Sequence, residues 1–487
     1  MKLPTFLGGV HPPEGKASTE DKAVEGLLPK GDLVYPLSQH IGAPCVPVVA
    51  KGDHVRVGQK IADSEAFVSA PIFSSVSGTV KEIGPRMTIP GSLEPCIVIE
   101  NDGLYEEGPS LLEELGHKPE PGEYVKLIRA AGIVGMGGAC FPTHVKLSPP
   151  KGSVIRWVIV NGAECEPYLS CDNRLMQERP ETIVRGLELV LELFPEARGV
   201  IAIENNKPKA IEALSGLVAK WKNPRISVMP HKVKYPQGAE KMLIWSVTGQ
   251  ETPPPPALPA DVGCIILNAR TTYQIWLALT KGQPVTDRII SVTGDAVAEP
   301  KNLEVPLGIS VQELIDACGG FKSNSGGKYP PETPESNSGE KCPPETPGAP
   351  VKVLAGGPMM GLAMRSLDVP VVKGTSGILA LTAKSAWIAE EGACLRCGRC
   401  VEVCPMRLEP TLLDHAVRRR DYAEFEAHGG MSCIECGSCA YTCPASRHLV
   451  QSYKDGKAAV TAARRAAAAA AKAKAEAAQK LETEAKK

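Results

Sequence analysis

The sequence predicts a multidomain protein that combines α/β and β folds, and three observations support that prediction. The chain has 487 residues, more than the roughly 250–300 that a single hydrophobic core usually holds. Strand-like and helix-like segments alternate through its middle, from about residue 156 to 282. Two stretches near its end, CLRCGRCVEVCP and CIECGSCAYTCP, each place four cysteines within eleven residues. The chain therefore needs several domains, one of them built around thiols.

Composition and charge exclude several classes of protein. Hydrophobic residues make up 43% of the chain and charged residues 22%, as in ordinary globular proteins. The net charge of −1 provides no positive field for nucleic acid. No apolar run approaches the roughly 18 residues of a membrane-spanning helix, and no signal core follows Met1–Pro4. We therefore expect no nucleic-acid partner and no transmembrane segment of the chain's own.

Residues 1–103 are expected to form an N-terminal barrel-sandwich-like domain. The segments KGDHVRVGQKIA and APIFSSVSGTV resemble the two halves of biotinyl and lipoyl carrier domains. Such carriers modify a lysine at the tip of a hairpin, but the tip here, SEAFVSAP at residues 64–71, contains none. We therefore predict a scaffold or docking module, with His40 and His54 as ordinary hydrogen-bonded or surface histidines.

Residues 104–285 are expected to form a Rossmann-like α/β domain. WVIV at 157–160 and CIILNA at 264–269 indicate buried strands, and PETIVRGLELVLELF at 180–194 has helical periodicity. This order of strands and helices indicates a mainly parallel sheet covered by helices. Such sheets bind ligands at the carboxyl ends of their strands, so the loops that follow strands are the candidate sites.

Three loops of this domain have residues suited to binding a ligand. In GIVGMGGACFPTHVKL, residues 132–147, the glycines permit close approach to an anion or a flat ring, and the lysine adds positive charge. NGAECEP places Glu164 and Glu166 just beyond a strand, and LNARTT places Asn268 and Thr271 beyond another. A plain turn and solvated glutamates would give the same patterns, so each loop alone is weak evidence.

Residues 286–385 are expected to form a β-grasp module. The segment SVTGDAVAEPKNLEVPLGISVQELIDACGG combines alternating strands, a Pro-Leu-Gly turn and one helix. Residues 323–350 within the module are rich in Ser, Gly, Pro and Glu and predict a disordered insertion. At the end of the chain, the Ala- and Lys-rich residues 451–487 predict an exposed helical tail.

The two cysteine runs predict a C-terminal bacterial ferredoxin-type domain with two [4Fe–4S] clusters over residues 386–450. Each run has the spacing C-x2-C-x2-C-x3-C-P, in which the fourth thiolate binds the other cluster. Structural zinc is the alternative, but zinc sites favour separated CxxC pairs, often with histidine. The predicted ligands are Cys394, Cys397, Cys400 and Cys443 for one cluster and Cys404, Cys433, Cys436 and Cys439 for the other. Most other cysteines are expected to be free, buried thiols.

Four motifs in this order, GMGGACFPT, VNGAECEP, YPQGAEKML and LNARTTYQI, resemble the flavin- and NADH-binding subunit of respiratory complex I. The resemblance implies an FMN site, with Glu166 and the turn at 238–240 towards the nicotinamide. Cys140 and Tyr168 stand where that family tends to have glycine. The implied cofactor-binding residues are Gly135, Gly137, Gly138, Lys146, Asn161, Glu164, Gly238, Glu240, Asn268 and Thr271.

The opening TFLGGVHPPEGK, the carrier-like segment and the cysteine runs together closely resemble the RnfC subunits of Rnf ion-translocating electron-transport complexes, from Thr5 to about Asp455. This resemblance implies an oxidoreductase subunit, peripheral on the cytoplasmic face of the cell membrane, that passes electrons between its clusters, FMN and NAD(H). It also implies membrane subunits and a ferredoxin-fed iron–sulfur subunit as partners. Glu164 and Glu166 would be the carboxylates of the catalytic pocket, where they would position flavin or nicotinamide and not act as general acid–base catalysts.

A flavin and two clusters on one chain form a chemically sensible set. Each cluster passes one electron, nicotinamide takes two as a hydride, and a flavin exchanges either number. Two alternatives stay open at the level of sequence. One is a soluble flavin–iron–sulfur reductase, such as a microcompartment cobalamin reductase, and the other is a non-catalytic iron–sulfur adaptor.

Overall fold

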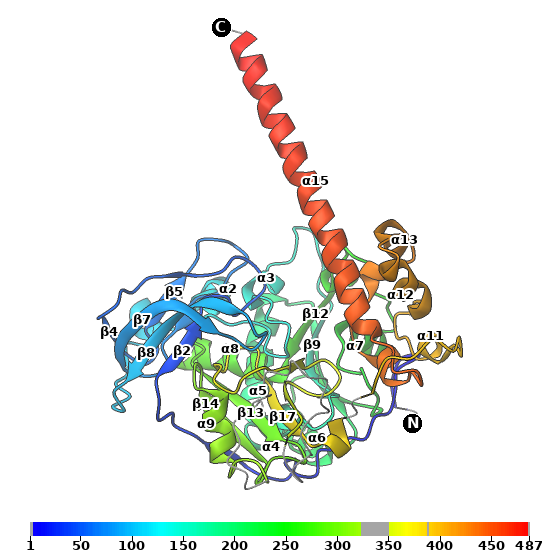
Figure 1. The fold of residues 1–487 in the computed structure, drawn as a ribbon. Helices are drawn as coiled ribbons and strands as arrows, with labels where there is room; N and C mark the ends of the chain where they lie inside the picture. Colours follow the sequence, from blue (N-terminus) through cyan, green and yellow to red (C-terminus); the bar gives the residue numbers. More distant parts are fainter. Residues whose placement is uncertain (1–2, 323–349, 387–388, 486–487) are drawn as a thin grey trace, which may run out of the picture. The chain divides into compact units, whose positions relative to one another are not determined.

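The computed structural model describes residues 3–322, 350–386 and 389–485, and side chains up to residue 472. All but the last residue of the predicted insertion, together with Cys342, therefore lies outside the described residues. The chain divides into two compact units, which can be followed along the sequence in Figure 1. Unit 1 comprises residues 1–5, 11–252 and 257–388, and unit 2 comprises residues 6–10, 253–256 and 389–487.

The first part of unit 1 is a β module of two small antiparallel sheets. One has the strand order β2-β8-β7-β4 and the other β3-β5-β6. Leu33, Ile61, Ile97 and Ile99 are fully buried between them, so the two sheets share one apolar core. The strands are β2 (Leu33–Pro36), β3 (Val46–Pro47), β4 (His54–Val55), β5 (Lys60–Asp63), β6 (Ile72–Phe73), β7 (Gly78–Met87) and β8 (Leu93–Asn101).

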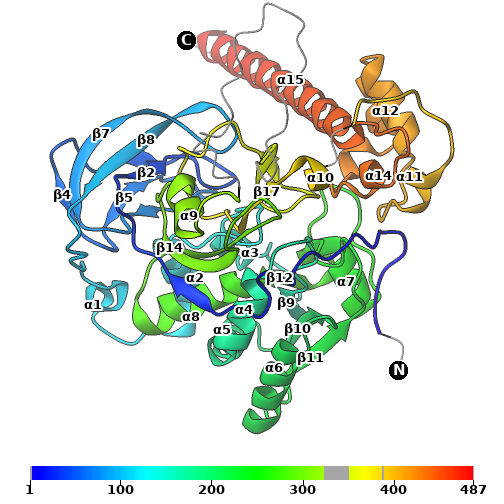
Figure 2. The same ribbon diagram turned by 60° about the horizontal axis from the view of Figure 1, so that its bottom comes forward.

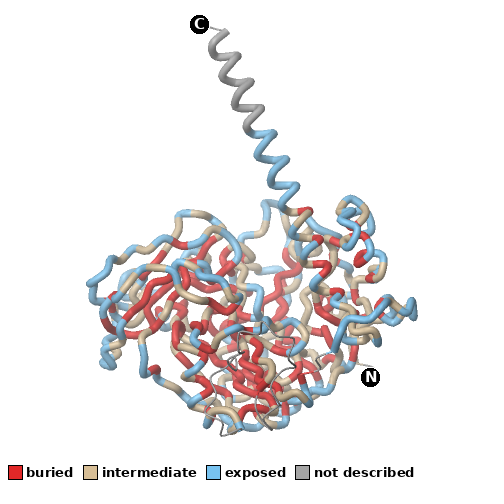
Figure 3. The backbone as a smooth tube through the Cα atoms, viewed as in Figure 1, coloured by how far each residue is buried: buried red, intermediate tan, exposed pale blue. Residues whose placement is uncertain are grey.

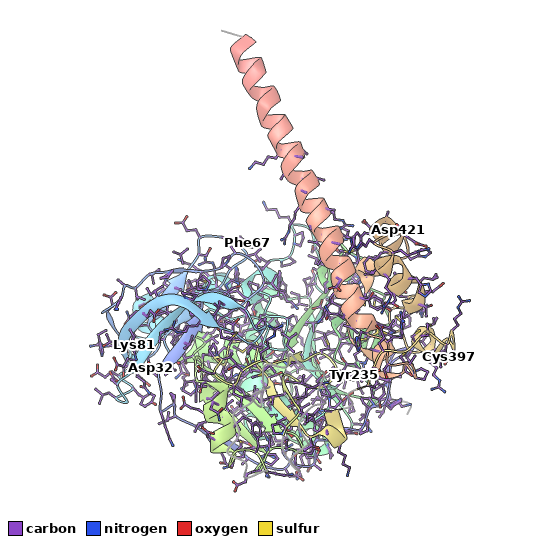
Figure 4. The ribbon with its side chains drawn as sticks, viewed as in Figure 1. Asp32, Phe67, Lys81, Tyr235, Cys397 and Asp421 are labelled. Atoms are coloured by element: carbon purple, nitrogen blue, oxygen red, sulfur yellow. The ribbon has the colours of Figure 1, made fainter. Side chains whose placement is uncertain are left out.

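The hairpin tip at residues 64–71 is held against two helices of the same unit, α2 (Pro121–Ala130) and α3 (Thr143–Lys146). Arg129 donates to the carbonyl of Ser64 at 2.6 Å, and His144 Nε2 donates to the carbonyl of Phe67 at 2.7 Å. Phe67 is labelled in Figure 4, and its ring meets that of His144 edge-on. A tip fixed in this way fits a scaffold and not a swinging arm, as the missing lysine predicts.

The middle of unit 1 is a parallel sheet with the strand order β11-β10-β9-β12. Its strands are β9 (Trp157–Gly162), β10 (Arg198–Glu204), β11 (Ile226–His231) and β12 (Cys264–Asn268), and its helices are α4 (Cys171–Glu178), α5 (Pro180–Leu193), α6 (Pro208–Trp221), α7 (Glu240–Thr248) and α8 (Ala269–Lys281). The predicted alternation of strands and helices is confirmed (Figure 2).

Side chains that alternate along these strands divide between the two faces of the sheet. Val158 and Ile201 pack in the same core as Leu187 of α5. Ile159, one residue on from Val158, packs with Leu243 of α7 on the other face. Because both faces are covered, the strands are almost wholly apolar until their carboxyl ends, where polar residues begin.

A second, mixed sheet of six strands completes unit 1, in the order β1-β14-β13-β17-β15-β16. The helix of this region, α9, starts where the hydroxyl of Ser310 accepts from the amide of Glu313. The elements are β13 (Asp287–Thr293), β14 (Lys301–Pro306), α9 (Val311–Ala317), β15 (Lys352–Ala355), β16 (Leu362–Ala363) and β17 (Gly377–Leu381), joined by β1 (Val24–Gly26). Figure 3 shows the buried residues of these strands and of the parallel sheet. Four short helices lie between the main elements of unit 1: α1 (Leu111–Leu115), η1 (Pro259–Val262), α10 (Ala383–Ala386) and α3.

Unit 2 is a small helical body in which two short segments have the same backbone form. Gly398 and Gly437 have φ of +78° and +81°, and each precedes a one-turn helix, α11 (Arg399–Glu402) or α14 (Ser438–Tyr441). The other helices are α12 (Pro410–Arg418), α13 (Tyr422–Ala427), η2 (Gly430–Ser432) and α15 (Leu449–Ala485). The Ala- and Lys-rich tail thus continues a helix that begins in the core of the unit, where Tyr453 is buried.

The N-terminal segment Phe6–Val10 belongs to unit 2, although the residues on both sides of it belong to unit 1. The amide of Gly9 donates to the carbonyl of Val403 at 2.8 Å, which fixes the segment beside α11. Among the helices that the structure describes, none is both long and apolar enough to cross a membrane.

Candidate functional site

The predicted flavin loops meet at the carboxyl ends of β9 and β12, where Asn161 and Asn268 are paired in register on neighbouring strands. The glycine loop lies against the start of α8. The amide of Met136 donates to the hydroxyl of Thr271 at 2.8 Å, and a Cβ on Gly137 would lie 3.3 Å from that of Asn268. A side chain at Gly137 would therefore require Asn268 to shift by a few tenths of an ångström.

The turn before α7 joins the same group of loops. Asn161 Nδ2 donates to the carbonyl of Gly238 at 2.8 Å, and the amide of Gly238 donates to the thiol sulfur of Cys165 at 3.2 Å. Glu240 begins α7 and forms an ion pair with Lys146 of α3 at 2.7 Å. Direct contacts thus link the members of four pairs: Met136–Thr271, Gly137–Asn268, Asn161–Gly238 and Lys146–Glu240.

The geometry fits a phosphate-bearing flat ring. No atom would lie within 4 Å of a Cβ built on Gly138, whose φ is +109°, so backbone without a side chain faces open space there. Lys146 and Glu240 are only part-buried, with side-chain exposures of 29% and 38%. Lys146 can therefore exchange its carboxylate partner for a ligand anion at small cost.

Glu164 is buried and accepts hydrogen bonds from the start of α4. Its carboxylate accepts from the amides of Asp172 at 2.6 Å and Asn173 at 3.3 Å. Burial raises the pKa of Glu164 to about 7, although the positive charge of Lys16, 3.9 Å away, opposes the shift. A carboxyl group with a pKa near neutrality can hold or release a proton under ordinary conditions.

Glu166 lies between the loop after β15 and Tyr235, which stands three residues before the turn at 238–240 and is labelled in Figure 4. Its Oε1 accepts from the amides of Met359 at 2.7 Å and Met360 at 3.0 Å. A Cβ on Gly357 would lie 2.2 Å from Cγ of Glu166, so the carboxylate and this loop are closely packed. Burial raises the pKa of Glu166, and its hydrogen bonds with the two amides and with Tyr235 oppose the shift.

Three polar residues outside the predicted motifs support these loops: Lys16 and Arg288, which are buried, and Asp172, which is part-buried. Lys16 Nζ donates to the carbonyls of Glu164 at 2.8 Å and Glu166 at 3.0 Å. Asp172 accepts from Asn268 Nδ2 at 2.6 Å, and Arg288 donates to the carbonyl of Met136 at 3.1 Å. Lys16 and Arg288 lie more than 100 residues from their partners in sequence, and no local pattern indicates such contacts.

The two departures from the family pattern occur at backbone positions that favour glycine. Cys140 has φ of +49° and Tyr168 has φ of +68°, both in the left-handed region that only glycine adopts without strain. The amide of Tyr168 donates to the carbonyl of Glu14 at 2.7 Å. At both positions the backbone therefore follows a path that glycine would also allow. The side chains of Cys140 and Tyr168 change only which atoms line the loops.

The eight cysteines of unit 2 surround two separate cavities, and their grouping is the one that the sequence spacing predicts. One cavity is lined by Cys394, Cys397, Cys400 and Cys443, and the other by Cys404, Cys433, Cys436 and Cys439. Among the described residues, no three His, Cys, Asp or Glu side chains converge on one point as ligands of a single ion do. Thiols spread around a cavity fit a cubane, whose iron atoms each take one thiolate.

Backbone amides point at the sulfurs in both halves of this arrangement. The amide of Arg396 donates to Cys394 Sγ at 3.4 Å, and the amide of Glu435 donates to Cys433 Sγ at 3.3 Å. Such donors stabilise thiolate charge and adjust the reduction potential of a cluster. Arg396 and Glu435 both have positive φ, +53° and +56°, so the two halves share this backbone arrangement.

The histidines and scattered cysteines of unit 1 have the roles that the sequence predicts. Buried His40 accepts from the amide of Ala70 at 3.1 Å, and exposed His54 lies 3.3 Å from Asp102. Five of the six scattered cysteines are buried and Cys165 is partly exposed, and all six are unpaired: Cys45, Cys96, Cys165, Cys171, Cys264 and Cys318.

Four family models match the chain along its length. Residues 4–104 match the RnfC barrel sandwich hybrid domain, and residues 128–277 match the Nuo51 FMN-binding domain. Residues 289–328 match the SLBB domain, and residues 386–444 match the 4Fe-4S dicluster domain. The barrel-sandwich, flavin and ferredoxin classes expected from the sequence are each confirmed by one of these models.

Curated relatives match nearly the whole chain, and each is the RnfC subunit of its complex. That of the Na⁺-translocating ferredoxin:NAD⁺ oxidoreductase complex of Acetobacterium woodii is 42% identical over 96% of this chain and 99% of its own length. That of the proton-translocating ferredoxin:NAD⁺ oxidoreductase complex of Clostridium ljungdahlii is 43% identical over 87% of this chain and 86% of its own. That of the ion-translocating oxidoreductase complex of Rhodobacter capsulatus is 40% identical over 93% and 82%.

Proposed function

This chain belongs to the family of RnfC subunits of ion-translocating ferredoxin:NAD⁺ oxidoreductase complexes, and from that membership we propose how it works. It is an oxidoreductase subunit that passes electrons between two [4Fe–4S] clusters in unit 2 and an FMN and NAD(H) site in unit 1. Its partners are the other subunits of the complex, among them a ferredoxin-fed iron–sulfur subunit. It works at the cytoplasmic face of a cell membrane, as a peripheral subunit.

The observation that supports this function most directly is the meeting of four predicted loops at the ends of β9 and β12. Bound FMN would supply the chemistry that links one-electron clusters to a two-electron nicotinamide. The glycine loop at 135–138 gives the ring system access to backbone amides. Lys146 offers positive charge to a phosphate, and Asn161 and Asn268 hold the loops at the ends of the two strands.

The two carboxylates have different parts in this proposal. Glu164 accepts from the amides of Asp172 and Asn173 and so positions the start of α4 beside the cofactor loops. Glu166 positions the loop at 357–360 by accepting from the amides of Met359 and Met360. Lys16, bound to the carbonyls of both residues, keeps this segment in place.

The test uses full-length protein, purified anaerobically with both clusters reconstituted. We expect one FMN for each chain and bleaching of the cluster absorbance on adding NADH. The Lys146→Met variant should bind FMN at least tenfold more weakly and shift the unfolding midpoint little, since its ion pair is part-exposed and worth about 0–1 kcal/mol.

Lys151→Met replaces an exposed lysine five residues further along and is the matched control, which should bind FMN as the unaltered chain does. Clusters without flavin, and no bleaching by NADH, would contradict the proposal and make the chain an iron–sulfur adaptor. Equal FMN affinity in Lys146→Met would remove that lysine from the site.

A further inference from the structure

The two cluster-binding loops of unit 2 have the same backbone but different side chains. Positive φ occurs at Arg396 and Glu435, the third residue of each loop, and at Gly398 and Gly437 two residues later. The loops therefore correspond position by position along residues 394–400 and 433–439. At equivalent positions the first loop has Leu, Arg and Arg where the second has Ile, Glu and Ser. The difference between the loops thus lies in the surfaces that they present.

The first loop faces solvent. Leu395 is 67% exposed, and Cys397 is the only exposed thiol among the described cluster cysteines (labelled in Figure 4). Arg396 and Arg399 are exposed as well. An electron can enter or leave a cluster only where a partner approaches closely, so an exposed ligand marks an accessible edge of the cluster.

The second loop is covered by residues of its own unit. Ser438 is fully buried, and Cys436 and Cys439 are only 7% and 9% exposed. Lys457 of α15 donates to the carbonyl of Cys433 at 2.9 Å and pairs with Glu435 at 2.6 Å. The start of the long helix thus covers this loop and neutralises its one charged side chain.

The charge of the exposed loop is not neutralised within the described part of the chain. Neither Arg396 nor Arg399 lies within ion-pair distance of a carboxylate there, and exposed Glu402 is the nearest acidic residue in sequence to Arg399. Asp414, which lines the same cavity, is occupied by Arg418 and Arg447. The loop over this cluster site therefore presents an exposed leucine flanked by two guanidinium groups. Neither group has a carboxylate partner among the described residues.

We propose that the loop at residues 394–400 is the docking surface for a small acidic iron–sulfur protein, and that the cluster of Cys394, Cys397, Cys400 and Cys443 exchanges electrons with it. This inference rests on the proposed function and specifies where electrons enter or leave the chain. One electron passes from the reduced cluster of the partner to this cluster, and no bond forms or breaks. The covered cluster then exchanges electrons only within the chain.

Charge complementarity identifies the partner. Guanidinium groups around a small apolar contact attract an acidic surface at long range and orient it, while a small contact area allows rapid release. Because exposed charges are screened within about 8 Å at physiological ionic strength, such docking weakens as salt rises.

The test measures the rate at which a reduced two-cluster bacterial ferredoxin of net negative charge reduces the clusters of the full-length holoprotein, by stopped flow. We expect the Arg396→Glu/Arg399→Glu variant to be at least tenfold slower than the unaltered chain at low salt. The difference should shrink as salt is added. Arg396→Gln/Arg399→Gln, which removes charge without reversing it, should give an intermediate rate.

Arg464→Glu/Arg465→Glu on α15 changes the net charge equally beside the covered loop and should react at the normal rate. Reduction by a small zwitterionic viologen should be equally fast in all variants, which shows that the cluster is intact. Equal ferredoxin rates in the Arg396/Arg399 variants, or a greater loss in the α15 variant, would overturn the proposal. NADH-driven bleaching is measured separately. Its absence would count against the flavin site and would not affect the comparison of ferredoxin rates.

Discussion

At the scale of single residues, the environment of Glu164 differs from the one that its sequence suggests. NGAECEP resembles a polar surface loop, but Glu164 has positive φ and lies buried against the start of α4. Its partner Lys16 lies 148 residues earlier in the chain. The buried carboxyl group of Glu164 is tolerated because backbone amides and an ammonium group surround it.

This burial predicts a pH dependence of stability. The pKa of Glu164 is about 7 in the folded chain against 4.5 for an ordinary glutamate, so its stabilising effect is full below pH 4.5 and is lost as the pH rises to 7. The loss amounts to roughly 3 kcal/mol. Glu164→Gln cannot ionise, so its free energy of unfolding relative to the unaltered chain should rise by this amount between pH 4.5 and 7.

Urea unfolding of both proteins across that range measures the difference. Any constant effect of the amide group cancels, because it does not vary with pH. Glu181→Gln, which replaces an exposed glutamate in α5, should follow the unaltered chain at every pH. Parallel curves for Glu164→Gln and the unaltered chain would show that Glu164 is not buried as an acid of raised pKa.

The residues of the candidate site were easier to predict from the sequence than the residues that support them. The glycines, the two asparagines and Lys146 stand in local motifs, and the structure brings them together. Lys16 and Arg288 could not be found, since their contacts are with distant backbone carbonyls that no local pattern specifies. Glu166 was expected to lie towards the nicotinamide, as was the turn at 238–240, and no motif indicated its contact with the amides of the loop at 357–360.

At the scale of elements, Asn268 links a strand, a helix and a loop. It ends β12, and its side-chain oxygen accepts from the amide of Arg270 as the N-cap of α8. Its Nδ2 donates to the carboxylate of Asp172 in α4 at 2.6 Å. The amide side chain of Asn268 thus satisfies both a helix end and the part-buried carboxylate of Asp172.

Replacing Asn268 should therefore cost two interactions. Asn268→Ala removes an N-cap, worth about 1 kcal/mol, and leaves the part-buried carboxylate of Asp172 without this donor, which costs about 1 kcal/mol more. Asn268→Ser keeps a capping oxygen but is too short to reach Asp172, so it should lose only the second part. Chemical unfolding at pH 7 separates the two variants, and equal losses would show that the cap contributes nothing.

The strands and helices of the parallel sheet were predictable because both faces are buried, which gives long apolar runs separated by amphipathic helices. β1 was not predictable. It has three residues, Val24–Gly26, with largely exposed side chains, and it pairs through its backbone with Asn302–Glu304 of β14, far along the chain. Backbone pairing of this kind leaves no side-chain pattern in the sequence.

At the scale of the whole molecule, the chain has two units with different means of stabilisation. Unit 1 has an extensive apolar core, whereas unit 2 has a small one around Leu413, Phe425 and Tyr453 and two thiol-lined cavities. Metal binding commonly supplies much of the folding free energy of such small bodies. Cys443, from the second cysteine run, lines the cavity of the first run and so ties the two halves of the unit together.

This crossing predicts which cysteine variants resemble one another. Cys394→Ser and Cys443→Ser should lose the same cluster and leave the same electron paramagnetic resonance spectrum after reduction. Cys404→Ser and Cys433→Ser should both lose the other cluster and should share the spectrum of the cluster that remains. All four should keep their FMN, because the flavin loops belong to unit 1. A spectrum of Cys443→Ser that matches Cys433→Ser would contradict the crossed assignment.

The path of the N-terminal segment limits how such a protein can arise by recombination. Phe6–Val10 belongs to the ferredoxin-like unit, and the amide of Gly9 supplies a hydrogen bond to Val403. A gene fusion that appended residues 389–487 to a foreign flavoprotein would leave that carbonyl and its neighbours uncovered. Exchange of either segment alone therefore carries a cost at the other.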